Sequence, residues 1–120
     1  MTIQPLKRCL LESVQGAGRI LLAHFGRSAQ ARRKENRASV VCEADLMAER
    51  FVIERIRRQF PAHGIIAEET GCLPGDGEFT WVIDPLDGTS NFVAGIPWFG
   101  AQIGVLRGNT PLLGAMYLPG

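Results

Sequence analysis

Two aspartates three residues apart, Asp84 and Asp87, are the residues whose type and spacing most clearly suggest chemistry. They belong to the stretch Trp81–Phe92, WVIDPLDGTSNF, in which a short apolar run delivers Asp84 to the end of a predicted strand. Pro85 fixes φ and removes an N–H group, so we expect a tight turn that aims both carboxylates at one point, with the Leu86 carbonyl between them. Such hard oxygen ligands suit Mg²⁺ rather than zinc.

Three small residues, Gly88, Thr89 and Ser90, follow directly. Gly88 allows the backbone to approach an anion closely, and the other two supply hydroxyl and N–H groups. If a short helix begins near Asn91, its first N–H groups face the same anion, and one loop holds a divalent cation beside a phosphate. Asp, Pro, Gly and Ser are also favoured in plain β-turns, so the DPxDG core taken alone favours an ordinary turn, and it is the surrounding residues that favour a ligand site.

Carboxylates without nearby bases mark the second half of the chain. Residues 64–120 hold six acidic residues and a single base, Arg107. Solvent screening or a bound cation must offset this charge. Glu68 follows the predicted short strand 65–67 and could add a carboxylate to the same site. The two histidines, His24 and His63, lie away from the motif, so imidazole ligation is not expected.

The chain has the size and composition of one folded domain, with 120 residues, 46% hydrophobic and 21% charged. It has no apolar run long enough to span a membrane, and its first residues do not predict a secretory signal. Three widely spaced cysteines without a CxxC pair indicate reduced thiols, and hence the cytoplasm. The arginines of the first half alternate with glutamates, which favours a solvated helix face over a nucleic-acid surface.

Two amphipathic helices must support the predicted site, over residues 5–26 and 43–60. Apolar residues recur at helical spacing in both, namely Leu10, Val14, Ala17, Leu21 and Phe25, then Ala48, Val52, Ile56 and Phe60. We expect Leu11, Gly18 and Leu22 to widen the first row. Gly16 and Gly18 either weaken that helix or admit a neighbouring backbone.

Between and after the helices the pattern changes. Residues 27–38 indicate an exposed connection or a hairpin, and residues 40–42 a short strand. Further strands are predicted at 65–67, 81–83, 101–106 and 112–117, with a loop over 70–79 and a turn over 107–110 that makes the last two strands antiparallel. Helices followed by strands indicate an α+β layer arrangement.

The motif WVIDPLDGTSNF, followed by Val93 and by Gly95-Ile96-Pro97, resembles the first signature of the inositol monophosphatase family of Mg²⁺-dependent, lithium-sensitive phosphatases. The likeness extends upstream to residues 65–69 and to Glu43-Ala44-Asp45. It covers the whole chain, residues 1–120, as one domain. The fold it implies is the N-terminal half of a layered α-β-α-β-α arrangement, with two long helices packed on a mostly antiparallel sheet.

The resemblance also implies roles for individual residues. Metal ligands would be Glu68, Asp84, Asp87 and the carbonyl of Leu86; phosphate would be held by Gly88, Thr89 and Ser90; and catalysis would use Glu68, Thr89 and Asp45. Asp45 would pair with Thr89 to orient and deprotonate the attacking water. Lys34 stands where the family often has a lysine near the metals, although Arg33 and Arg37 are alternatives. For Glu69 a structural or solvated role is favoured, and for Trp81 and Trp98 a packing role.

The implied activity is Mg²⁺-dependent hydrolysis of a phosphate monoester, in which a metal-activated water attacks phosphorus in line. The partner would be a small phosphorylated metabolite such as an inositol phosphate, and a full-length protein would be a homodimer without membrane or nucleic-acid partners. The sequence departs from the family in lacking the Trp-Asp pair of its second signature and in having Ala94 where histidine is usual. The alternative is therefore a truncated, non-catalytic remnant that binds cation and phosphate only. Without the second half, one face of the sheet should expose apolar surface.

Overall fold

The computed structural model describes residues 3–30, 34–94 and 96–118, except the side chains of residues 26–30, 34–38 and 90. Two long helices come first, and a short helix later interrupts the strands: α1 (Gln4–Gln30), α2 (Lys34–Gln59) and α3 (Thr89–Ala94). The strands are β1 (Gly64–Ala67), β2 (Gly71–Leu73), β3 (Phe79–Asp87), β4 (Gly100–Arg107) and β5 (Thr110–Tyr117). This order confirms the predicted α+β class.

The described strands form one sheet in the order β2-β1-β3-β4-β5. β1 and β3 are parallel, and every other neighbouring pair is antiparallel, so the sheet is mostly antiparallel as predicted. In the parallel pair Ala67 lies opposite Ile83. The C-terminal ends of β1 and β3 therefore meet at the same edge of the sheet, where ligand-binding groups of such pairs commonly lie.

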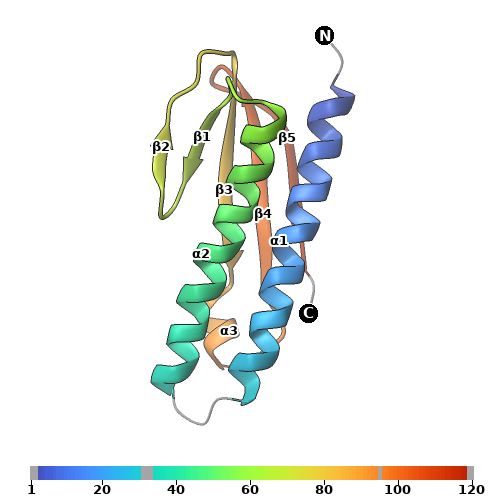
Figure 1. The fold of residues 1–120 in the computed structure, drawn as a ribbon. Helices are drawn as coiled ribbons and strands as arrows, with labels where there is room; N and C mark the ends of the chain where they lie inside the picture. The colour runs from blue at the N-terminus through green and yellow to red at the C-terminus, as the bar shows by residue number, and fades with distance from the viewer. Residues whose placement is uncertain (1–2, 31–33, 95, 119–120) are drawn as a thin grey trace.

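The two long helices lie side by side on one face of the sheet (Figure 1). Their predicted apolar rows are buried, with Phe25 and Phe60 partly exposed at the ends. Alternation along the strands sends Trp81, Ile83 and Val105 to the same side, where they complete the core. Among the described elements, no helix has the length and apolar composition that crossing a membrane would require.

The opposite face of the sheet has no described helix over it (Figure 1). Ile66, Val82 and Met116 point to this side, and each exposes more than a third of its surface. Gly104 lies opposite Gly114 in the register of β4 and β5, which leaves a groove between the flanking side chains. We refer to this surface as the open face.

The second helix begins at Lys34 rather than near residue 43. The predicted connection over residues 27–38 is therefore wrong for residues 27–30 and 34–38, which are helical, and the predicted strand at 40–42 is wrong as well. Residues 31–33 lie outside the described residues. Val41 and Ala44 are buried together with Ala48, so the apolar row continues backwards at helical spacing. Burying that row outweighs the strand preference of adjacent valines.

The strands are also longer than predicted. β2 forms inside the predicted loop 70–79 because it pairs antiparallel with β1. β3 extends from Phe79 to Asp87 instead of ending at Asp84. Trp81 is buried as predicted and donates from Nε1 to His63 Nδ1 at 3.0 Å, whereas Trp98 is 73% exposed and does not have the predicted packing role.

The contact between α1 and its neighbours is closer than the sequence suggested. A Cβ on Gly16 would overlap the ring of Phe51, and a Cβ on Gly18 would overlap the ring of Tyr117. These glycines thus admit aromatic side chains rather than a neighbouring backbone. Leu11 and Leu22 are each 45% exposed, so they do not widen the apolar row of α1.

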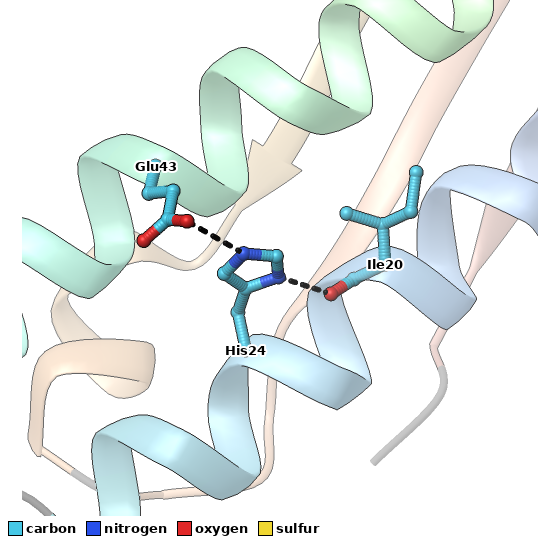
Figure 2. Close-up of polar contacts among 3 residues, drawn as sticks. All are labelled: Ile20, His24 and Glu43. Carbon is cyan, nitrogen blue, oxygen red and sulfur yellow. Dashed lines mark hydrogen bonds and ion pairs between the residues drawn. The ribbon is translucent and has the colours of Figure 1, made fainter.

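A polar contact joins α1 to α2 beside the predicted site (Figure 2). His24 is 6% exposed and donates from Nδ1 to the carbonyl oxygen of Ile20 at 2.9 Å. Its Nε2 lies 3.8 Å from Oε1 of Glu43, which is longer than a hydrogen bond. Glu43 stands two residues before Asp45, so this contact links the site-bearing turn of α2 to α1.

Candidate functional site

Three of the predicted carboxylates, Asp45, Glu68 and Asp84, lie near the place where β1 ends beside β3, whereas Asp87 lies three residues further along β3. Because Ala67 pairs with Ile83, the next residues, Glu68 and Asp84, occupy equivalent positions on neighbouring chain segments. Asp45 approaches from α2, which packs against β3. Residues 45, 68 and 84 are thus brought to one region by a helix and two strands.

Three carboxylates meet in this region: one oxygen each from Asp45, Glu68 and Glu69 lies within 4.8 Å of the other two. Glu68 and Glu69 are exposed, whereas Asp45 is half-buried, and its Oδ1 is buried without a hydrogen-bond partner among the described residues. A buried carboxylate oxygen is costly unless a proton, a donor or a cation satisfies it. Hard oxygen donors in this arrangement fit a divalent cation such as Mg²⁺.

The electrostatics of Asp45 reflect the same crowding. Burial, together with the negative charges of Glu68, Glu69, Glu49 and Asp84, raises the pKa of Asp45 to about 6, and burial is the largest cause. Removal from water disfavours the charged form of a carboxyl group, as do like charges nearby. Both effects would be relieved by a cation placed among these groups.

Asp84 and Asp87 are held by a bulge in β3, where the sequence predicted a tight turn. The pairing with β4 is regular as far as Asp84 opposite Gln102 and resumes at Asp87 opposite Gly100. Burial and the charge of Asp87 raise the pKa of Asp84, while a hydrogen bond from the Leu86 backbone lowers it. Asp87 is exposed and its Oδ2 accepts a hydrogen bond from Gln102 Nε2 at 3.0 Å.

Gly88 begins the turn that follows the aspartates. Its φ of +90° is a left-handed conformation that favours glycine, and a Cβ there would lie 2.8 Å from the carbonyl oxygen of Trp98. The N–H of Phe92 donates to the Gly88 carbonyl at 3.0 Å, so the expected short helix forms but begins at Thr89, two residues before Asn91. Phe92 is fully buried against Phe25 and Phe99, so it anchors α3 in the core.

Some predicted site residues are not brought into contact. Thr89 is exposed, and no hydrogen bond joins it to Asp45 among the described residues, so their pairing stays a prediction. The backbones of Lys34 and Ser90 are helical, but their side chains lie outside the described ones. Glu69, for which the sequence favoured a structural or solvated role, lies within the carboxylate cluster beside Glu68.

Two polar residues near the site were not predicted from the sequence. Gln102 binds Asp87, and Glu49 binds the backbone after Glu68. Glu49 was detectable in principle, because it stands four residues after Asp45 and next to the buried Ala48, where an acid is unusual. Nothing in the sequence marked Gln102, because its contact with Asp87 depends on how β3 pairs with β4.

The groove on the open face reaches the site at one end. It encloses about 540 Å³ and is lined by Val82, Asp84, Gln102, Ile103, Gly104, Gly114, Ala115 and Met116. Only Asp84 and Gln102 in that lining have polar side chains. The carboxylate cluster itself is not part of this lining, so the groove borders the site instead of enclosing it.

Comparison with known proteins places these features in a family context. The family model described as "Inositol monophosphatase family" matches residues 2–120. An inositol-1-monophosphatase from Synechocystis sp. is 40% identical over 109 residues, which are 90% of this chain and 38% of the relative. The Nus factor SuhB of Haemophilus influenzae is 34% identical over 119 residues, which are 98% and 45% of the two chains. The chain therefore spans less than half the length of these relatives.

Solved structures share the fold. The inositol monophosphatase from Anabaena (Nostoc) sp. has a TM-score of 0.82 at 36% identity, over 99% of this chain and 42% of that one. SaIMPase-II with 2′AMP bound has a TM-score of 0.78 at 26% identity, over 96% and 42%. The same enzyme with inositol monophosphate bound has 0.78 at 25%, over 98% and 42%. These likenesses confirm the predicted fold class.

Proposed function

The chain belongs to the inositol monophosphatase family, and on that premise we propose that it forms the cation- and phosphate-binding part of a Mg²⁺-dependent phosphomonoesterase. The observation that carries the proposal is the cluster of Asp45, Glu68 and Glu69, whose oxygens lie within 4.8 Å of one another beside the unpartnered Asp45 Oδ1. Such a group of like charges is unfavourable until a cation neutralises it.

The proposed Mg²⁺ ligands are the carboxylates of Glu68, Asp84 and Asp87 and the carbonyl oxygen of Leu86. All are hard oxygen donors, as Mg²⁺ requires. When bound, Mg²⁺ supplies charge neutralisation for phosphoryl oxygens and lowers the pKa of a water molecule. The raised pKa of Asp84 beside Asp87 supports this assignment, since it marks a concentration of negative charge.

Phosphate would be held by the turn that follows the aspartates. Gly88, Thr89 and Ser90 would contribute N–H and hydroxyl groups to its oxygens. The exposure of Thr89 supports this role, because it leaves that part of the turn accessible. Lys34 would add a positive charge nearby.

In the proposed reaction Glu68 and Thr89 orient a water molecule opposite the ester bond. Asp45 accepts its proton through the Thr89 hydroxyl as the water oxygen attacks phosphorus in line. The bond from phosphorus to the alcohol oxygen breaks, the alcohol oxygen takes a proton from a solvent water molecule, and Asp45 afterwards returns its proton to solvent, so the products are an alcohol and inorganic phosphate. Positioning and electrostatic stabilisation account for most of the catalysis of such reactions.

The proposed substrate is a small phosphorylated metabolite, an inositol phosphate or a similar phosphomonoester. The support comes from SaIMPase-II, whose structures hold inositol monophosphate and 2′AMP. A cytoplasmic location belongs to the same proposal, supported by three free cysteines.

A second candidate is favoured by one observation: the matched region is only 38–45% of the relatives. In this version the chain binds Mg²⁺ and phosphate but does not turn substrate over. Phosphate release from inositol monophosphate, measured beside a calorimetric Mg²⁺ titration of the same preparation, separates the two. Binding with release supports the first candidate, binding alone supports the second, and no Mg²⁺ binding contradicts both.

A further inference from the structure

One buried acid lies outside the proposed ligand set: Glu49 on α2, which is 1% exposed. Its Oε1 accepts a hydrogen bond from the N–H of Glu69 at 3.0 Å. Its Oε2 accepts from the N–H of Thr70 at 2.9 Å and from Thr70 Oγ1 at 2.7 Å. Bonds to a charged acceptor are stronger than bonds between neutral groups, and three of them satisfy a carboxylate that has lost its water.

The position of Glu49 connects these bonds to the cluster. It stands four residues after Asp45, so the two carboxylates lie one turn apart on the same face of α2. Glu69 and Thr70 form the turn that joins β1 to β2, directly after Glu68. One turn of α2 thus places Asp45 among the cluster oxygens, while the next turn binds the backbone that carries Glu68 and Glu69.

We propose that Glu49 is a positioning residue for the carboxylate cluster, holding the turn after β1 against α2 so that Glu68 and Glu69 face Asp45. This inference rests on the proposed function, because it concerns the cation for which Glu68 is a proposed ligand. Glu49 itself donates no ligand atom to the cluster. Besides placing a negative charge near Asp45, Glu49 acts through the backbone amides of Glu69 and Thr70, and groups that orient ligands in this way strongly influence metal affinity.

The test compares Glu49→Gln with the wild-type chain. The glutamine keeps the size of the side chain but has one acceptor oxygen, and its NH₂ group cannot accept from a backbone N–H. We expect the Mg²⁺ affinity, measured by calorimetric titration with MgCl₂, to fall by about tenfold or more. We also expect the Glu69 and Thr70 amides to lose protection from hydrogen exchange in the metal-free chain, a readout that does not depend on activity.

Two further variants separate positioning from general stability. Ile56→Val removes a methylene from the same buried face of α2, about two turns beyond Glu49. It should lower the melting temperature and leave the Mg²⁺ affinity unchanged. Thr70→Val removes only the hydroxyl donor at an exposed residue, and it should reduce the affinity by less than Glu49→Gln does. If Glu49→Gln does not fold, the Mg²⁺ affinity of Thr70→Val alone tests the positioning role of Glu49.

Each outcome bears on a different part of the inference. Unchanged Mg²⁺ affinity in folded Glu49→Gln, or in Thr70→Val where only that variant folds, overturns the positioning role and leaves the proposed function standing. An equal loss of affinity in Ile56→Val overturns it as well, because general stability would then explain the effect. A wild-type chain that does not bind Mg²⁺ overturns the proposed function and this inference with it.

Discussion

Asp45 combines partial burial with a surrounding of acids, and this environment gives the metal-free protein a specific pH dependence. Its pKa is about 6 in the folded chain against 3.8 for an ordinary aspartate, chiefly because of burial. Between these values the folded state binds more protons than the unfolded state. The free energy of unfolding therefore decreases as pH rises from 4 to 6, and the loss is complete above pH 6.

We predict that Asp45→Asn stabilises the metal-free chain at pH 7 by about 1–2 kcal/mol, a value reduced for the partial exposure of the carboxyl group. The asparagine carries no charge, so its advantage should vanish below pH 4. Urea unfolding of both proteins in EDTA, from pH 4 to 7.5, measures this difference. Parallel curves across that range would contradict the assigned environment of Asp45. Added Mg²⁺ should stabilise the wild type more than the variant.

Asp87 differs from Asp45 in being exposed and held by Gln102. We predict that Asp87→Asn lowers Mg²⁺ affinity by at least about tenfold and abolishes any phosphate release, because it removes one charged ligand. Affinity for inorganic phosphate should change less, since Gly88 and Thr89 remain. Asp76→Asn, at another exposed acid outside the site, is the control for loss of charge. Retained turnover in Asp87→Asn would refute the role of Asp87.

At the scale of elements, the spacing between α1 and α2 depends on a glycine. Alanine normally stabilises a helix by about 1 kcal/mol relative to glycine. At Gly16, however, the added Cβ overlaps the Phe51 ring, and overpacking of a core costs about 1–3 kcal/mol. The second effect is larger, so we predict that Gly16→Ala lowers the free energy of unfolding by up to about 2 kcal/mol.

Urea unfolding measures this change directly. Phe51→Leu provides the matched background, since a smaller side chain should remove most of the penalty of Gly16→Ala. A Gly16→Ala variant more stable than the wild type would show that the helices are free to separate at this point.

The helices and strands were only partly predictable from the sequence. The helical rows of α1 and α2 were predictable because burial follows local periodicity. The start of α2 was not, because adjacent valines favour a strand until Val41 and Ala44 are seen to pack with Ala48. β2 was missed for a different reason: Gly71–Leu73 is only three residues long and is followed by Pro74 and Gly75, which indicate a loop, and it becomes a strand only by pairing with β1.

At the scale of the whole molecule, the open face is the most exposed apolar surface of the sheet. Ile66 is 44% exposed, Val82 37% and Met116 51%, and the first two are neighbours in the register of β1 and β3. Contiguous apolar surface of this kind promotes association in water. We predict that the chain self-associates at micromolar concentration, as sedimentation velocity would show.

Val82→Lys should shift this equilibrium towards monomer, because the charge would have to be buried in the contact. Gln15→Lys adds the same charge at an exposed position of α1 and should leave association unchanged. A wild-type chain that stays monomeric at about 100 µM would contradict the prediction that the open face drives self-association.

The sequence by itself determined the local features of this protein. The periodic rows of the two long helices and the motif from Trp81 to Phe92 follow from residues close together in the chain. The packing of the chain was needed to show how distant residues meet. The parallel pairing of β1 and β3 sets Glu68, already expected at this site, beside Asp84, while the place of Glu69 in the cluster and the bond of Glu49 to an amide twenty residues away were not expected. The physical reason is that turn chemistry and periodicity act over a few residues, whereas these contacts depend on how α2 and the sheet pack against each other.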